Sequence, residues 1–151
     1  MSSSWRRWRA LEPLDRRLSK ESLRALLAVR TRLAVTSFDA CLAWSRAVPA
    51  NTRSDSAEPK RIARAVERAA RFVPGSRCLA KALAARVLLR RRGLDPELCL
   101  GAGRDGDRRL VAHAWLELAG RVVYGDPEPG RFRPFDAVPG EPGTRMPSDP
   151  S

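Results

Sequence analysis

The hydrophobic period of this chain changes once, at Asp95-Pro96, and that change limits the folds open to it. Before this point apolar residues recur at helical spacing; after it they alternate with the period of two that is typical of strands. The predicted helical segments are about 19–48, with a possible break at Thr36-Ser37, then 59–73 and 76–92. The predicted strands are 98–102, 110–118 and 121–126. Helices followed by a small antiparallel meander predict an α+β fold.

Composition divides the chain into three predicted parts. Residues 1–58 read as a basic helical arm and linker, in which Trp5 and Trp8 have no assignable role. Residues 59–136 hold the periodic segments from Pro59 onward and form the predicted core. Residues 137–151 are rich in Pro and Gly, and we expect a disordered tail there.

The formal net charge is +12, carried by 26 Arg and only 3 Lys. Such a charge suits nucleic acid, an anionic membrane surface or an acidic peptide. The Arg residues are spread over every segment, and no nucleic-acid motif is present. The favoured interpretation is that the Arg content reflects a general compositional bias and not a binding surface, so no nucleic-acid partner is expected. A basic binding module without enzymatic activity stays open as an alternative. No stretch reaches about 18 apolar residues, and an odd number of cysteines favours a reducing compartment, so we expect a cytoplasmic protein.

Cys78 opens the third helical segment. Ser76 is a suitable N-cap, which places Arg77 at the first helical position and Cys78 at the second. A thiol acts as a nucleophile in its thiolate form, and the free amides and dipole at a helix start stabilise that anion. The alternative is a small buried hydrophobe. The presence of a single histidine downstream favours the nucleophile.

His113 is the only histidine and lies 35 residues after Cys78, inside the strand 110–118. It is the only side chain here that can act as an imidazole base. If Ala119-Gly120 is a two-residue hairpin, the strand pairing places Asp126 opposite His113. The Asp126 carboxylate can then accept the Nδ1 proton and leave Nε2 for the thiol. The pairing depends on the register, because a shift of one residue moves Asp126 to the other face.

Composition narrows the remaining roles. The chain has no Gln, and its only Asn is Asn51 in the linker, so the orienting group must be a carboxylate and the oxyanion donor must be backbone N–H, first that of Cys78. Glu117 shares the His113 face and is the reserve orienter, while Trp115 is the expected wall of the site. One His and three widely spaced Cys give no zinc-binding pattern, and no nucleotide-binding motif is present, so no metal or cofactor is expected.

Four motifs lie between Arg61 and Gly125. They are Ser-Arg-Cys-Leu-Ala-Lys-Ala-Leu over 76–83, Leu-Leu-Arg-Arg-Arg-Gly over 88–93, Leu-Cys-Leu-Gly over 98–101 and Ala-His-Ala-Trp-Leu-Glu over 112–117. In this combination the stretch resembles the lasso peptide leader peptidases, which are cysteine proteases with a transglutaminase-like (papain-like) core. The resemblance implies that Cys78 is the nucleophile, His113 the base and Asp126 its orienter.

The resemblance also implies a reaction and partners. Such a peptidase removes the leader from a ribosomally synthesised lasso peptide precursor through a Cys-His-Asp triad and a thioester intermediate. Because residues 1–58 read as helix and not as a winged helix, the stand-alone type is expected, which works with a separate leader-recognition protein and passes the core peptide to an ATP-dependent macrolactam synthetase. A transglutaminase-like acyltransferase or amidase acting on another substrate would use the same residues and stays open, as does an inactive scaffold.

Overall fold

The computed structural model describes residues 3–51, 56–125 and 132–135, and within them the helices precede the strands as predicted. The helices are α1 (Ser3–Arg9), α2 (Pro13–Val35), α3 (Phe38–Ala47), α4 (Pro59–Ala70) and α5 (Cys78–Arg91). The strands are β1 (Glu97–Arg104), β2 (Leu110–Leu118), β3 (Arg121–Tyr124) and β4 (Phe132–Pro134). The α+β prediction is confirmed.

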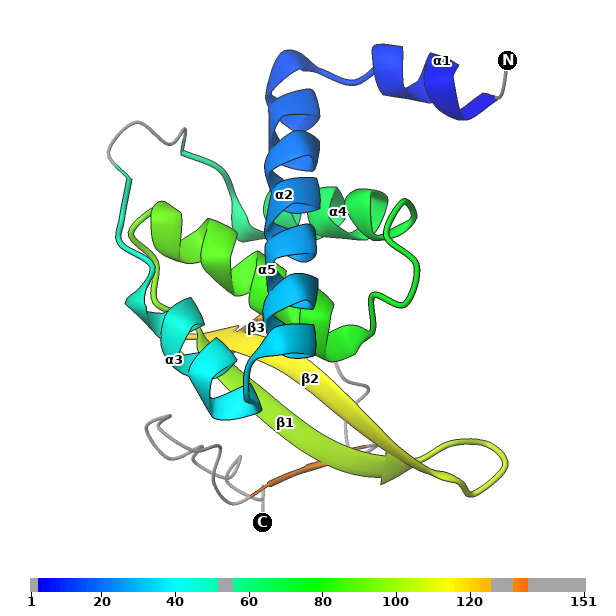
Figure 1. Ribbon diagram of the computed structural model, residues 1–151. Helices are drawn as coiled ribbons and strands as arrows, with labels where there is room; N and C mark the ends of the chain where they lie inside the picture. Colours follow the sequence, from blue (N-terminus) through cyan, green and yellow to red (C-terminus); the bar gives the residue numbers. More distant parts are fainter. Residues whose placement is uncertain (1–2, 52–55, 126–131, 136–151) are drawn as a thin grey trace.

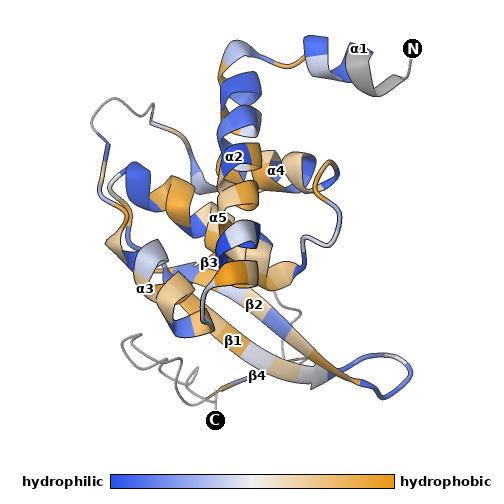
Figure 2. Ribbon diagram, viewed as in Figure 1, coloured by the Kyte–Doolittle hydropathy of each residue, from blue (hydrophilic) through white to orange (hydrophobic). Residues whose placement is uncertain are grey.

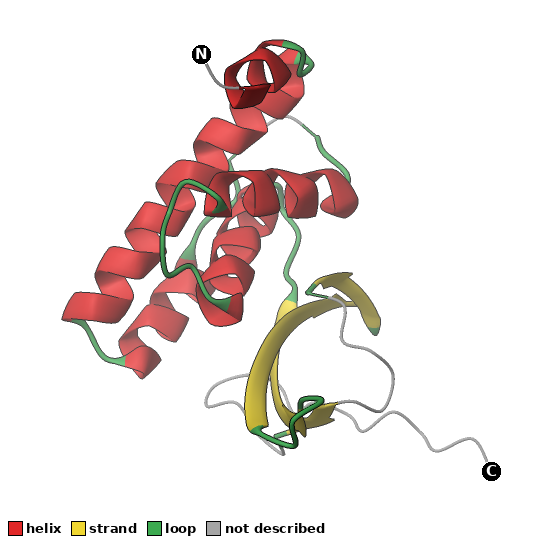
Figure 3. Cartoon of the chain, turned by 90° about the vertical axis from the view of Figure 1, so that its right-hand side faces the viewer, coloured by secondary structure: helices red, strands yellow, loops and turns green. Residues whose placement is uncertain are grey.

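The strands form one antiparallel sheet in the order β3-β2-β1-β4. The helices lie on one side of it (Figure 1), and the two long strands curve with their convex side toward the helices (Figure 3). The predicted meander corresponds to β1, β2 and β3. Strand β4 was not predicted; it pairs with β1, and the backbone N–H of Phe135 continues that pairing by donating to Leu100 at 2.8 Å.

One hydrophobic core joins the helices to the sheet. Helix α5 is apolar over most of its length, whereas the first turns of α2 are mainly hydrophilic on their outer side (Figure 2). Leu98 and Leu116 face the helices and are fully buried. Residues of the expected N-terminal arm belong to the same core, because α2 packs on both α4 and α5 and contributes Leu18, Leu26 and Val29. No helix of the described segments is both long and apolar enough to cross a bilayer.

Local signals explain most helix ends. The predicted break falls between α2 and α3, where Ser37 Oγ accepts a hydrogen bond from the N–H of Ala40 at 3.1 Å. Gly93, with a φ of +80°, follows α5 as a C-terminal glycine should. The start of α5 differs from the prediction: Arg77 is the N-cap and Cys78 the first helical residue, one position earlier in the helix than expected. Ser76 Oγ makes no hydrogen bond with any described residue, so it does not cap the helix.

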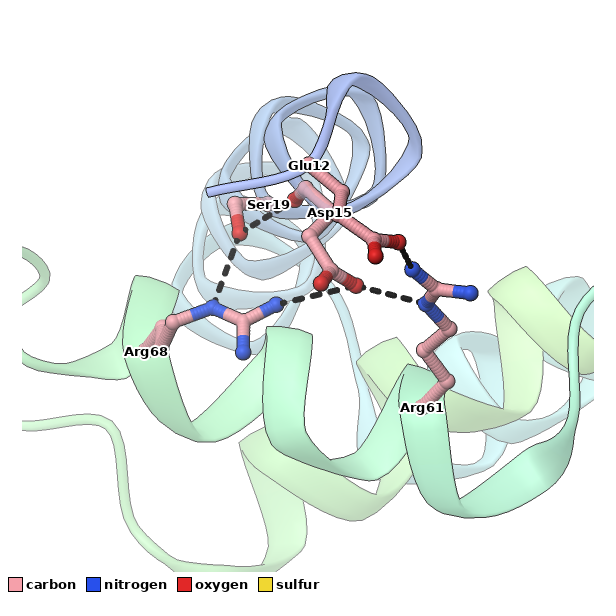
Figure 4. Close-up of polar contacts among 5 residues, drawn as sticks. All are labelled: Glu12, Asp15, Ser19, Arg61 and Arg68. Carbon is pink, nitrogen blue, oxygen red and sulfur yellow. Dashed lines mark hydrogen bonds and ion pairs between the residues drawn. The ribbon is translucent and has the colours of Figure 1, made fainter. Parts of the chain in front are cut away.

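A polar cluster joins α2 to α4 (Figure 4). The Asp15 carboxylate accepts a hydrogen bond from Arg61 Nε at 2.7 Å and lies 3.7 Å from Arg68 Nη2. Ser19 Oγ accepts from Arg68 Nε at 3.2 Å, and Glu12 also pairs with Arg61. The hydrogen bond from Arg61 is the main cause that lowers the pKa of Asp15, and the charges of the nearby arginines act in the same direction. The cluster therefore sets the orientation of Arg68 on the outer side of α4.

Candidate active site

Cys78 is the cysteine whose sulfur approaches the surface. It is half-buried at the first position of α5, whereas Cys41 and Cys99 are 1% and 0% exposed. Burial raises the pKa of the Cys41 thiol, which keeps it protonated and unreactive. The geometry thus separates one accessible thiol from two that serve as packing groups.

The start of α5 is arranged to accept a negative charge. The first N–H groups of an α-helix have no partner inside the helix, and no side chain caps them at Arg77. The first turn contains no acidic residue, and the Arg77 side chain is exposed beside it. The amide of Cys78 and its neighbours can therefore donate to an anion next to the sulfur.

The Cys78 thiol lies against the edge of β2. Its Sγ is 3.8 Å from the carbonyl oxygen of Ala112, the residue before His113. Strand β3 ends at Tyr124, so this part of β2 is not covered by it. Helix α5 and strand β2 therefore bring the sulfur to within one residue of the only histidine in the chain.

His113 is half-buried between aromatic rings. Its ring centroid lies 4.9 Å from that of Phe132 and 6.1 Å from that of Trp115, both nearly parallel to it. Its Nε2 is 2.6 Å from the carbonyl oxygen of Gly125, which fits an Nε2–H donor and leaves the lone pair on Nδ1. Nε2, which the expected pairing left for the thiol, contacts the segment after β3 in the structure.

The pairing of β2 with β3 does not keep one register along its length. Leu118 pairs with Arg121 and Glu117 with Val122, as the two-residue turn at Ala119-Gly120 predicts. Leu116 then pairs with Tyr124, because a β-bulge inserts an extra residue in β3. The single register from which Asp126 was placed opposite His113 therefore holds only for Glu117 and Leu118 and shifts by one residue at Leu116. Asp126 itself lies outside the described residues, and its role stays a prediction.

Side-chain alternation places the thiol and the imidazole on two sides of the same strand edge. Ala114 and Leu116 belong to the core beneath the helices, so His113 and Trp115 project from the face turned away from the helices. Cys78 approaches from the helical side. Each of the two groups hydrogen-bonds to a backbone carbonyl at this edge, Cys78 to Ala112 and His113 to Gly125. The structure thus brings the thiol and the imidazole to one edge of β2, where each contacts a different backbone carbonyl.

Trp115 and Glu117 form one unit beside the imidazole. Trp115 is 3% exposed, and its Nε1 donates to Glu117 Oε1 at 2.9 Å. Its ring covers Gly101, where a Cβ atom would come within 3.0 Å of the ring carbons. The indole is therefore held in place beside His113, as a wall would be, and the reserve orienter Glu117 contacts Trp115 instead of the imidazole.

Sequence reasoning missed a partly buried polar contact that Tyr124 makes with helix α4. The Tyr124 hydroxyl donates to Glu67 Oε1 at 2.5 Å, and Lys81 Nζ pairs with the same carboxylate at 3.1 Å. Burial is the main cause that raises the pKa of Tyr124, followed by the hydrogen bond to Glu67 and by the charges of Glu67 and Cys78. The contact joins α4, α5 and the end of β3. No local pattern marks Glu67, since it lies 57 residues away from Tyr124 along the chain.

Gly125 was also missed, although a signal was present. It has a φ of +73°, and a Cβ atom there would lie 2.9 Å from the carbonyl oxygen of Ala114. Only glycine adopts this conformation without strain and allows such a close approach. Tyr124 bonds to Glu67 on α4, and the next residue, Gly125, contacts His113. These two neighbouring residues therefore connect the helical layer to the imidazole.

Comparison with known proteins gave one match. The sequence profile described as Transglutaminase-like superfamily matches residues 7–136, from α1 to the residue after Phe135. No curated protein and no solved structure shows significant similarity to this chain.

Proposed function

This chain belongs to the transglutaminase-like superfamily, and we propose that it is a cysteine peptidase that removes the leader from a ribosomally synthesised lasso peptide precursor. The family supports acyl transfer through a cysteine. The observation that carries the proposal is the position of Cys78, half-buried at an uncapped helix start, with its sulfur beside the backbone of the residue before His113. The choice of a lasso precursor rests on the motif resemblance over 76–117.

In the proposed reaction the His113 ring, whose Nε2 contacts the Gly125 carbonyl in the structure, turns around the edge of β2 and accepts the proton of the Cys78 thiol at Nδ1. The sulfur attacks the scissile carbonyl, and the amide of Cys78 donates to the oxyanion. His113 then protonates the leaving amine, which leaves a thioester on Cys78. Water hydrolyses that thioester, with His113 accepting one of its protons. The reaction requires the imidazole to reach the thiol around the edge of β2, and Asp126 is the proposed carboxylate that holds it there.

The proposed partners are the precursor peptide, a separate leader-recognition protein of the winged-helix type and an ATP-dependent macrolactam synthetase. The N-terminal third supports the stand-alone type of peptidase, because the described residues 3–47 form helices α1, α2 and α3. A leader-binding winged helix would need strands in that region. The chain would then receive its substrate from a second protein.

The proposal is tested with a precursor peptide and its recognition protein, using mass spectrometry to detect leader loss. Cys78→Ala should reduce cleavage by a factor on the order of 10³ or more, because no other group can form the thioester. Cys99→Ala is the matched control, since it removes a buried thiol on β1. Full cleavage by Cys78→Ala with an unchanged circular dichroism spectrum would contradict the assignment.

A second experiment tests the pairing of the thiol with the imidazole. A small bifunctional haloketone alkylates Cys78 first and bridges to His113 only if Nδ1 or Nε2 reaches the sulfur. Mass spectrometry of the digested protein should show the bridged peptide pair in the wild type and a single adduct in His113→Ala. A single adduct in both proteins would show that the two groups do not meet.

The second candidate is an acyltransferase or amidase acting on another substrate. The family match supports it as strongly as it supports the leader peptidase, because the match carries no substrate information. Supplying an amine acceptor distinguishes the two. A peptidase transfers the acyl group to water, whereas an acyltransferase gives an amide product of matching mass.

A further inference from the structure

A groove of about 720 Å³ lies between α1, α2 and the end of α4, away from the candidate active site. Its apolar lining includes Trp8 on α1, Leu11 just after α1, Leu23 on α2, and Phe72 just after α4. Phe72 is 62% exposed, although it is one of the largest apolar side chains in the protein. Apolar surface gathered in a concave site is typical of a place where another molecule binds.

The charged residues that line the groove are all basic. Arg7 lies on the α1 side, Lys20 on α2, and Arg68 and Arg71 at the end of α4. Arg68 is held by Asp15 and Ser19, so its guanidinium is fixed at the groove and not free to move into solvent (Figure 4). Lys20 and Arg71 are exposed. An occupant that satisfies this lining carries acidic groups around apolar ones.

We propose that this groove binds an acidic, amphipathic segment of a separate polypeptide, with large apolar side chains against Leu23 and Phe72 and carboxylates toward Lys20 and Arg71. The concave shape suits side chains that insert into it, whereas a bilayer surface needs a convex or flat apolar face. The apolar lining does not suit a nucleic acid backbone, which is recognised mainly by phosphate contacts. Binding here does not require Cys78, so the proposal stands or falls separately from the peptidase.

The position of the groove gives such binding a consequence. Phe72 lines one end of the groove, and six residues later the chain reaches Cys78 at the start of α5. A polypeptide seated in the groove would be tethered to the chain that carries the candidate active site. The groove would therefore raise the local concentration of whatever the bound partner carries.

The test measures fluorescence anisotropy of the full chain with a labelled synthetic peptide, which has leucines at helical spacing and glutamates between them. Phe72→Ala should weaken binding about tenfold, since an aromatic anchor is lost. Arg71→Glu should weaken it about tenfold at low salt and less at high salt. The matched controls are Leu110→Ala, which removes an apolar residue that is 74% exposed on β2, and Arg121→Glu on β3. All four positions are exposed, and thermal unfolding checks that each variant folds.

Binding that is lost in both groove variants and kept in both controls supports the proposal. Replacing the glutamates by glutamines, or the leucines by serines, should also weaken binding. The proposal is overturned if the peptide does not bind at low salt, or if the groove variants and controls bind equally. It is also overturned if a labelled single-stranded oligonucleotide or a vesicle of phosphatidylglycerol binds more tightly and loses affinity in Phe72→Ala.

Discussion

The two sides of helix α4 are joined to the rest of the fold by different kinds of polar contact. Toward α2, Asp15 pairs with Arg61 and Arg68 in a cluster that water reaches, with the Arg61 side chain 29% exposed. Toward β3 and α5, the hydroxyl of Tyr124, a residue that is only 5% exposed, donates to Glu67, whose side chain is 53% exposed. Exposed ion pairs contribute little to stability because water and salt screen them, whereas the Tyr124 ring is fixed in the core and its hydroxyl donates to a charged acceptor. The β3 side should therefore be the more sensitive of the two, and it is the side that holds Gly125 near His113.

The largest effect is expected from Tyr124→Phe. Removing the hydroxyl breaks its hydrogen bond to Glu67, which water and Lys81 can still reach, so the free energy of unfolding should fall by about 0.5–1.5 kcal/mol. Because Gly125 follows directly, cleavage should also slow while peptide binding in the groove is unchanged. Urea unfolding and the leader-loss assay measure the two effects. Glu67→Gln, which keeps an acceptor for the hydroxyl, should lose less stability; an equal loss would show that the charge on Glu67 matters more than the hydrogen bond.

The free energy of unfolding at alkaline pH should also depend on the contact between Tyr124 and Glu67. The pKa of Tyr124 is raised in the folded protein, so the unfolded chain releases this proton first, from about pH 10 upward. The stabilisation is complete below that pH and is lost as pH rises, by about 1.4 kcal/mol for each pH unit for one group. Denaturant midpoints of the wild type and Tyr124→Phe should converge above pH 10. Parallel curves through that range would contradict a buried, un-ionised phenol.

The smallest effect is expected on the α2 side. Asp15→Asn should lower the free energy of unfolding by about 1 kcal/mol or less, because its partners are partly exposed. The pKa of Asp15 is lowered in the folded protein, so its contribution is present at neutral pH and lost as pH falls below about 4. Chemical unfolding at pH 7 and pH 3 measures this difference. Asp107→Asn in the β1–β2 loop is the control. If Asp15→Asn lowered the free energy of unfolding more than Tyr124→Phe does, the α2 side and not the β3 side would be the more sensitive.

The helical layer was largely predictable, and particular residues show why. The break at Thr36-Ser37, the start of α4 at Pro59 and the glycine end of α5 at Gly93 are short-range signals, and each appears in the structure where the sequence placed it. The exception is the start of α5, where Ser76 does not act as a cap. A cap depends on the path of the chain before the helix, and that path follows the packing of Pro74 and Gly75 against Arg30.

The candidate site was predictable in its members and less so in its geometry. Cys78 and His113 are marked by their scarcity and by their positions in a helix and a strand, and both lie at one edge of β2. The contact between His113 Nε2 and the Gly125 carbonyl was not predicted, and a single bulge in β3 breaks the uniform register on which the placement of Asp126 relied. A bulge is determined by how the strand fits against the helices, and Tyr124 fits there through Glu67 on α4.

By itself the sequence determined the order of helices and strands, their approximate ends and the residues able to perform thiol chemistry, because helical and strand periodicity and residue type are local properties. Only the tertiary structure decided that α2 enters the core, that β4 pairs with β1, and that the thiol and imidazole flank one edge of β2. It also decided that an apolar groove with a basic rim opens beside α4. These features depend on contacts between residues far apart in the chain, whose free energies are set by packing and leave no repeating pattern in the sequence.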